Sequence, residues 1–272
     1  MFEICFLGGG KMASAILDGA HSAGVVELDA VHVVERLEES RISLSTRFTG
    51  VSVSEDLEPA KLYVLATKPQ DVSNIAKSAR ALVDGDSVSW NEPPILVSIA
   101  AGITRVRLES LFGDGFRIVR TMPNTAVAVK SGVVAICDDP DVDRPALDRV
   151  EELFSGVAHI VRVPEAKVDA VTAISGSGPA YFMYLVEAME EAGVTIGLTA
   201  DMARELAICT MAGSAKLAAT SSSTPRQLRL DVTSPGGTTA QAIRVFDRGG
   251  LRSTIMEAVI ACYERAKELD SK

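Results

Sequence analysis

Short apolar runs alternate with amphipathic stretches over residues 1–164. Runs rich in Val and Ile predict strands at residues 3–7, 31–35, 61–66, 95–99, 116–120 and 133–137. Apolar residues spaced three and four apart predict helices at residues 12–23, 37–47, 71–82 and 144–154. Alternation of strands and helices on this scale is typical of βαβ units, so we expect an α/β domain with a mostly parallel sheet.

The pattern changes after residue 164. Helical spacing continues at residues 180–192, 200–219, 239–246 and 251–269, and Gly, Pro and Ser separate these stretches. We therefore predict two domains: an α/β sheet domain over residues 1–164 and an all-helical domain over residues 165–272.

Composition excludes several classes of protein. The 272 residues carry 27 basic and 36 acidic side chains, a net charge of −9, which argues against nucleic-acid or anionic-membrane partners. Hydrophobic residues make up 47% but aromatic residues only 5%, so the apolar content is mostly aliphatic, as buried strands and packed helices require. The apolar runs are too short to cross a bilayer, and the N-terminus has no signal-like stretch. Four scattered Cys and three His predict neither a metal site nor disulfides, and so a reducing cytoplasm.

A glycine turn follows the first predicted strand. Gly8-Gly9-Gly10-Lys11-Met12-Ala13 fits G-x-G-x-x-A at the opening of a helix. In that context glycines let the backbone approach a pyrophosphate, which then lies at the helix N-terminus. The alternative is a turn with a purely structural role, but the strand before it and the helix after it favour dinucleotide binding.

The second predicted strand ends in two opposed charges, Glu35 and Arg36. Glu35 is suited to accept a hydrogen bond from an adenosine 2′-hydroxyl, which favours NADH. Arg36 is suited to pair with a 2′-phosphate, which favours NADPH. A solvated charge pair at the end of a strand is the third interpretation, and the sequence leaves all three open.

Two more turns follow strands at the same predicted edge of the sheet. Residues 66–70, which include Ala66, Thr67, Lys68 and Pro69, follow one strand, and residues 98–102 follow the next. Ligands of open α/β sheets lie outside the carboxyl ends of the strands, so we expect both turns to face the cofactor. An exposed loop lysine is an equal alternative for Lys68.

A second candidate site lies in the helical part. Pro235, Gly236 and Gly237 end one element before Thr238 opens a helix. Free N–H groups and a partial positive charge at such a helix start suit a small carboxylate, and nearby hydroxyls can bind a nitrogen. Ordinary helix capping explains the same residues equally well.

Two segments of the helical part resemble one family. Ser-Gly-Ser-Gly-Pro-Ala-Tyr at residues 175–181 and Val-Thr-Ser-Pro-Gly-Gly-Thr-Thr at residues 232–239 are similar to segments of the pyrroline-5-carboxylate reductases. The resemblance covers essentially the whole chain. It implies an N-terminal Rossmann domain and a C-terminal helical domain that forms an interleaved homodimer, which in this family often assembles into decamers.

The resemblance also implies an activity: reduction of 1-pyrroline-5-carboxylate to L-proline, the last step of proline biosynthesis, with NADPH, or alternatively NADH, as hydride donor. Thr239 and Ser234 are the implied catalytic residues. Substrate binding is predicted for Ser234, Gly236, Gly237, Thr238 and Thr239. Cofactor binding is predicted for Gly8, Gly10, Lys11, Met12, Ala13, Glu35, Arg36, Ala66, Thr67, Lys68, Pro69, Ala100 and Ala101.

Two alternatives accompany this interpretation. A β-hydroxyacid dehydrogenase shares the layout but carries a catalytic Lys on its first long helix, and residues 175–187 contain no Lys. A redox sensor that binds NAD(P)H without turnover would not need the 234–239 segment, which is intact here.

Overall fold

The computed structural model describes residues 1–85, 88–138, 140 and 143–270. The chain divides into two compact units. The sheet unit comprises Met1–Gly176 together with Tyr263–Lys272, and the helical unit comprises Ser177–Cys262. The domain boundary predicted after residue 164 stays a prediction.

Eight described strands form one sheet in the order β3-β2-β1-β4-β5-β6-β7-β8. Neighbouring strands pair in parallel except for β6 and β7, which are antiparallel. The mostly parallel sheet is therefore confirmed. The strands are β1 (Phe2–Leu7), β2 (Val31–Val34), β3 (Ser52–Ser54), β4 (Ala60–Leu65), β5 (Ile95–Ser98), β6 (Arg117–Pro123), β7 (Gly132–Cys137) and β8 (Ala158–Val163).

Two of these strands were not predicted, and both lie at an edge of the sheet. β3 has only three residues, two of them Ser, so it carries no apolar run. β8 alternates half-buried residues with exposed ones such as His159 and Arg162, because an edge strand packs on fewer neighbours than a central strand.

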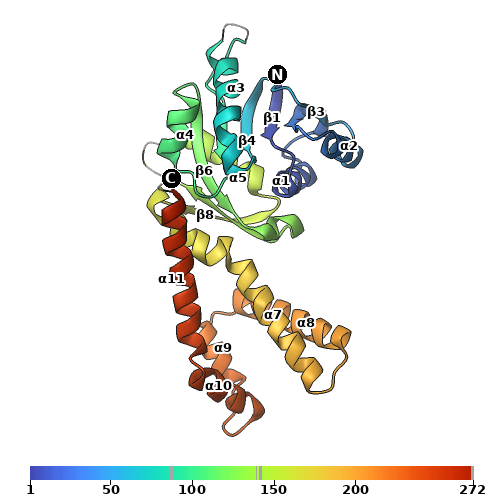
Figure 1. Ribbon diagram of the computed structural model, residues 1–272, viewed down its shortest axis with the longest axis vertical. Coiled ribbons are helices and arrows are strands. Elements are labelled where there is room, and N and C mark those ends of the chain that lie inside the picture. The colour runs from blue at the N-terminus through green and yellow to red at the C-terminus, as the bar shows by residue number, and fades with distance from the viewer. Residues whose placement is uncertain (86–87, 139, 141–142, 271–272) are drawn as a thin grey trace. The chain divides into compact units, whose positions relative to one another are not determined.

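Two clusters of buried side chains cover opposite faces of the sheet. Ile4 and Phe6 of β1 belong to the cluster that includes side chains of α1, α2 and α5. Cys5 and Leu7 belong to the cluster that includes side chains of α3 and α4, two helices that pack against one another (Figure 1). Successive strand residues point to opposite faces, so a strand covered on both faces needs an unbroken apolar run.

The helices of the sheet unit confirm the four predicted ones and add others. They are α1 (Lys11–Ser22), α2 (Glu38–Arg47), α3 (Val72–Asp84), α4 (Arg105–Phe112), α5 (Arg144–Phe154) and α6 (Val168–Val171), followed by a π-helical turn (Thr172–Gly176). α4 was not predicted. Only its Leu108 and Phe112 are buried, so its eight residues have too weak an apolar pattern to be detected.

The helical unit contains α7 (Gly178–Thr195), α8 (Ala200–Thr220), α9 (Pro225–Asp231) and α10 (Thr238–Arg248), and α11 (Leu251–Asp270) begins in it. α7 and α8 pack side by side (Figure 1). A Cβ atom at Gly193 of α7 would lie 2.7 Å from that of Ala203 of α8, so these helices approach closely at small residues. α9, which was not predicted, begins at a cap where Thr224 Oγ1 accepts the Gln227 N–H at 3.3 Å.

Large apolar side chains lie exposed along the helical unit. Its buried hydrophobic residues are Val186, Ala203 and Ala207. Among its exposed ones are Phe182, Met183, Tyr184, Leu185, Met189, Met202, Leu206, Ile208, Leu217, Phe246, Ile255, Met256 and Ile260. Exposed apolar side chains in this number indicate a surface for association. Of the helices described, none is long and apolar enough to span a membrane.

Candidate functional site

The glycine turn between β1 and α1 packs tightly on the neighbouring strand ends. Gly8 has φ +109°, and its N–H donates to the carbonyl oxygen of Val34 at 3.0 Å. A Cβ atom at Gly8 would lie 2.9 Å from the carbonyl oxygen of Ala66 and 3.2 Å from the nitrogen of Thr67. The structure therefore brings the turns after β1 and β4 together, and only glycine fits at their contact.

Gly9 and Gly10 differ in what surrounds them. A Cβ atom at Gly9 would overlap the side chain of Leu44, so Gly9 permits close packing against α2. Gly10 has no heavy atom within 4 Å of its Cβ position. It is the N-cap of α1, and no side-chain hydrogen bond caps that helix. The start of α1 is therefore uncapped and has open space beside Gly10, an arrangement that suits an anion.

A cavity of about 370 Å³ adjoins the turn. Its lining includes Gly9, Gly10 and the exposed side chain of Lys11 from α1, together with Ser40 and Arg47 from α2. A second cavity, of about 240 Å³, is lined by residues of α4, β6 and α5 and includes none of the predicted site residues.

Thr67 carries the observation that bears most directly on a cofactor. Its Oγ1 is buried and has no hydrogen-bond partner among the described residues. A buried hydroxyl without a partner costs about 1–3 kcal/mol, so such a group calls for a ligand. The turn that carries it also holds the half-buried Ala66, the exposed Lys68, and Pro69, which begins a 3-10 turn (Pro69–Asp71). With Gly8 and Gly10, these residues fit a dinucleotide.

The turn after β5 lies next to the end of β4. The N–H of Ile99 donates to the carbonyl oxygen of Leu65 at 3.3 Å, and the N–H of Ala100 donates to Ser98 Oγ at 3.3 Å. The side chain of Ala100 is buried, whereas Ala101 is exposed. These two alanines therefore offer an apolar wall and backbone groups rather than a charged contact.

Glu35 lies at the glycine turn, directly after β2. Its Oε2 accepts the N–H of Gly9 at 3.2 Å, and its Oε1 accepts the N–H of Leu37 at 3.0 Å. Both oxygens of the carboxylate are thus held by backbone donors. An ionised carboxylate has about four acceptor positions, so each oxygen keeps a lone pair for another donor.

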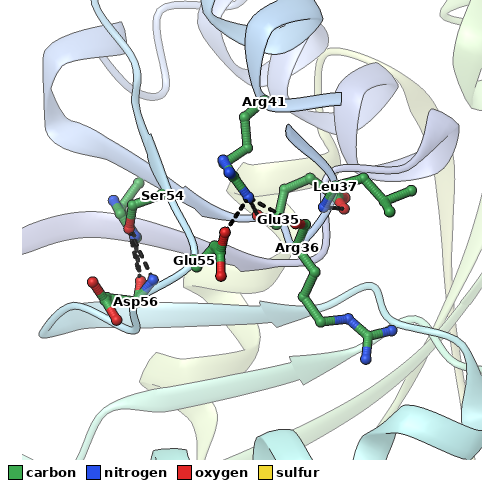
Figure 2. Close-up of polar contacts among 8 residues, drawn as sticks. Glu35, Arg36, Leu37, Arg41, Ser54, Glu55 and Asp56 are labelled. Atoms are coloured by element: carbon green, nitrogen blue, oxygen red, sulfur yellow. Dashed lines mark hydrogen bonds and ion pairs between the residues drawn. The ribbon is translucent and has the colours of Figure 1, made fainter. Parts of the chain in front are cut away.

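The two arginines on either side of this strand end, Arg36 and Arg41, both form ion pairs, and Figure 2 shows the pair that Arg41 forms with Glu55. Arg36 forms an ion pair with Asp71, at 3.0 Å between Nη2 and Oδ2. Nη1 of Arg41 donates to the carbonyl oxygens of Glu35 and Arg36, at 3.1 and 2.7 Å, and lies 2.8 Å from Oε1 of Glu55. We did not predict roles for Asp71 and Arg41, because their partners lie on other turns and leave no local pattern in the sequence.

The helical unit holds the second candidate site. The N–H of Gly237 donates to the carbonyl oxygen of Ser234 at 3.1 Å, and Gly236 has φ +73°, as in a type II turn with Pro235 at its second position. Gly237 is the N-cap of α10 and has no side-chain cap. A Cβ atom at Gly237 would overlap Oγ of Ser234, so glycine lets this hydroxyl lie against the start of the helix.

The remaining residues of this segment are the first two of α10. Thr238 is exposed and Thr239 is half-buried. The arrangement offers uncapped N–H groups and a hydroxyl at one helix start, which suits a carboxylate. Among the described residues, no group of three or more His, Cys, Asp or Glu side chains is placed to hold a metal ion.

Each of the two candidate sites lies in a segment that matches a known family model. Residues 165–269 match the family model of the pyrroline-5-carboxylate reductase dimerisation domain, and residues 3–102 match that of NADP oxidoreductase, coenzyme F420-dependent. The pyrroline-5-carboxylate reductase of Mycobacterium leprae is 39% identical, in an alignment that covers 99% of this chain and 97% of that relative. That of Methanosarcina acetivorans is 35% identical over 99% of this chain and 98% of its own.

Solved structures agree. The pyrroline-5-carboxylate reductase of Coxiella burnetii superposes with a TM-score of 0.87 at 33% identity and covers 98% of both chains. The pyrroline carboxylate reductase of Plasmodium falciparum, solved with NADP bound, gives a TM-score of 0.84 at 25% identity and covers 99% of this chain and 98% of its own.

Proposed function

Because this chain belongs to the pyrroline-5-carboxylate reductase family, we propose that it reduces the ring C=N bond of 1-pyrroline-5-carboxylate to form L-proline, the last step of proline biosynthesis, with NADPH or NADH as hydride donor. The observation that carries this proposal is the match over 99% of the chain to a reductase 39% identical to it. The chain is thus an oxidoreductase that acts on a C=N bond.

The cofactor would lie along the three turns at the carboxyl ends of β1, β4 and β5. The nicotinamide supplies the hydride; the chain binds and orients the dinucleotide. Gly10, Lys11, Met12 and Ala13 form the start of α1, where N–H groups suit the pyrophosphate. The unpartnered hydroxyl of Thr67 supports a contact from that turn. The further members of this proposed set are Gly8, Glu35, Arg36, Ala66, Lys68, Pro69, Ala100 and Ala101.

The substrate would lie at the start of α10. The N–H groups of Gly237, Thr238 and Thr239 would hold its carboxylate together with Ser234, and the turn at Gly236 sets their direction. The Thr239 hydroxyl would hydrogen-bond the ring nitrogen. A ring imine that binds already protonated needs no strong buried acid, so the work of these residues is positioning, which can lower a barrier by several kcal/mol.

The direct test is a spectrophotometric assay. Purified protein, 1-pyrroline-5-carboxylate and NADPH or NADH are mixed, and the absorbance of the reduced nicotinamide is followed while proline is quantified. We expect oxidation that depends on the substrate and yields one proline per nicotinamide. Absence of oxidation with both cofactors would refute the reductase function and favour the non-catalytic sensor, and turnover only with β-hydroxyacids would favour the dehydrogenase.

Thr239→Ala tests the substrate site within that assay. Loss of the hydrogen bond to the ring nitrogen should lower kcat/KM by roughly 10- to 1000-fold. Thr195→Ala is the matched control, since this hydroxyl of the same unit bonds the carbonyl oxygen of Glu191 at the end of α7. Equal kinetics for the two variants would remove Thr239 from the mechanism.

The dimerisation domain makes the chain a homo-oligomer. Its exposed apolar side chains support an interleaved dimer, and further association into a decamer is part of this proposal. Sedimentation velocity distinguishes the monomer, dimer and decamer masses.

We also propose that residues 1–164 bind the dinucleotide, that residues 165–272 bind substrate and dimerise, and that the enzyme works in the cytoplasm. Four free cysteines support that reducing compartment.

A further inference from the structure

We propose that the adenosine-ribose site of this chain selects against a 2′-phosphate, so that the enzyme prefers NADH to NADPH, and that Glu35 and Asp71 are the residues that set this preference. The inference rests on the proposed dinucleotide function and goes beyond it, because that function is served by either cofactor.

The position of the Glu35 carboxylate is fixed before any cofactor binds. Two backbone N–H groups hold it, that of Gly9 in the glycine turn at 3.2 Å and that of Leu37 at 3.0 Å. The acidic residue that ends the second strand of a Rossmann unit accepts hydrogen bonds from the ribose hydroxyls. Glu35 therefore offers an oriented acceptor to a 2′-hydroxyl and a fixed negative charge to a 2′-phosphate.

Arg36 is the residue that would bind a 2′-phosphate, but a carboxylate competes for its guanidinium, although the Arg36 side chain is 74% exposed. Its guanidinium forms a 3.0 Å ion pair with Asp71, whose side chain is 27% exposed, in the 3-10 turn that precedes α3. A 2′-phosphate would have to displace Asp71 or share the guanidinium with it. Either outcome leaves a carboxylate close to a group that carries roughly −1.5 to −2 charges, if its pKa resembles that of a phosphoserine.

Arg41 supplies no free positive charge in place of Arg36. Figure 2 shows its guanidinium between Glu55 and the backbone that joins Glu35 to Arg36. Only 22% of its side chain is exposed, and its Nη1 contacts two carbonyl oxygens as well as the carboxylate. Arg41 is thus a positioning residue: it holds the strand end that carries Glu35.

These contacts favour a hydroxyl on electrostatic grounds. The guanidinium groups of Arg36 and Arg41 each have a carboxylate partner, and Glu35 adds a negative charge that neither of them offsets. A ribose 2′-hydroxyl needs only an acceptor, which Glu35 provides. A phosphate needs an excess of positive charge, which Arg36 and Arg41 with their carboxylate partners do not supply.

Isothermal titration calorimetry with two unreactive probes tests the inference without turnover. ADP-ribose carries the 2′-hydroxyl and 2′-phospho-ADP-ribose carries the phosphate, and neither contains nicotinamide. We expect the wild-type protein to bind ADP-ribose about tenfold or more tightly than its 2′-phosphorylated form. Equal affinity, tighter binding of the phosphorylated probe, or no binding of either probe would overturn the inference.

Asp71→Asn separates the contribution of this carboxylate. It frees Arg36 without changing a helix cap, because the Asp71 side chain makes no capping hydrogen bond to α3. We expect the Kd of 2′-phospho-ADP-ribose to fall about two- to fivefold, and Arg36→Ala in the Asp71→Asn background to abolish this gain. The matched control is Asp84→Asn, which removes the same charge from an exposed ion pair with Arg80 at the other end of α3.

Equal effects of Asp71→Asn and Asp84→Asn would refute the role of Asp71. Glu35→Gln should reduce the ratio between the Kd of 2′-phospho-ADP-ribose and the Kd of ADP-ribose. An unchanged ratio would refute the role of Glu35. Failure of the proposed function is a separate result: no oxidation of NADH or NADPH with 1-pyrroline-5-carboxylate, while the two probes still bind with the expected ratio.

Discussion

Replacement of Gly8 by Ala should separate the structural role of the glycine turn from its role in binding. Gly8 has φ +109°, a conformation that a residue with a side chain rarely adopts. The Cβ atom that the substitution adds would also lie 2.9 Å from the carbonyl oxygen of Ala66 and 3.1 Å from its carbonyl carbon. Both of these are backbone atoms at the end of β4, so no side-chain rotation relieves the overlap.

The expected cost follows from these two terms. A non-glycine residue in a sparsely populated backbone region costs about 1–3 kcal/mol, and overpacking against a backbone that must shift adds roughly 1–3 kcal/mol. We expect Gly8→Ala to lower the free energy of unfolding by about 2–4 kcal/mol, which is a large part of the stability of a typical domain. The urea midpoint should therefore fall by about 1 M or more.

Gly10→Ala is the matched control in the same turn. Gly10 has φ −65°, and no heavy atom lies within 4 Å of its Cβ position. Replacing Gly by Ala at an N-cap lowers the free energy of unfolding, whereas a less flexible unfolded chain raises it. Each effect is below about 1 kcal/mol, and the two oppose one another. Stability should thus stay within about 0.5 kcal/mol of wild type. The new methyl group would occupy open space at the start of α1, where the backbone must approach the pyrophosphate, so the Kd of NADH should rise about tenfold or more.

Urea unfolding followed by circular dichroism, with calorimetric titration of NADH, measures both quantities for both variants. A Gly8→Ala variant with a free energy of unfolding within about 0.5 kcal/mol of wild type, the margin seen for neutral surface changes, would show that Gly8 is not required by the backbone here. A Gly10→Ala variant that binds NADH as tightly as the wild-type protein does would show that the cofactor does not approach the backbone at Gly10.

Three further predictions concern other parts of the chain. Gly237→Ala should raise the KM for 1-pyrroline-5-carboxylate about tenfold, because its Cβ would overlap Oγ of Ser234; an unchanged KM argues against a carboxylate site at this helix start. Burial raises the pKa of the Cys5 thiol well above its ordinary value, so Cys5 stays protonated and should react with a thiol reagent at pH 8 only after denaturation, as peptide mapping can verify. Arg120→Met should destabilise the protein by about 2–4 kcal/mol in urea titrations, because it removes a buried partner, 3% exposed, from the Glu165 carboxylate at 2.9 Å; full stability would mean that another group takes over this pairing.

The central strands were predictable because burial on both faces leaves a distinct pattern. All four residues of β2 and of β5 are buried, and all of them except His32 and Ser98 are apolar. The three-residue β3 and the half-exposed β8 lack this pattern, since edge strands are stabilised by pairing with a neighbour more than by their own burial.

The site was predictable where one short segment supplies the chemistry. The glycine turn was identified from its strand and helix context, and the structure shows why Gly8 and Gly10 differ. Glu35 favoured NADH and Arg36 favoured NADPH, and the sequence could not decide between them. The contacts of both side chains depend on groups that are distant in sequence. Asp71 is 35 residues from Arg36, and the contact between them exists only once the ends of β2 and β4 lie in one sheet.

The exposed apolar surface of the helical unit makes its stability depend on protein concentration. With Val186, Ala203 and Ala207 as its buried hydrophobic residues, this unit has little hydrophobic core within a single chain. Most of the free energy that orders its helices must then come from a second copy, so folding and assembly of these helices are one equilibrium. Dilution therefore shifts this unit toward the unfolded state. The sheet unit has buried clusters on both faces of its sheet and so keeps its core in a single protomer.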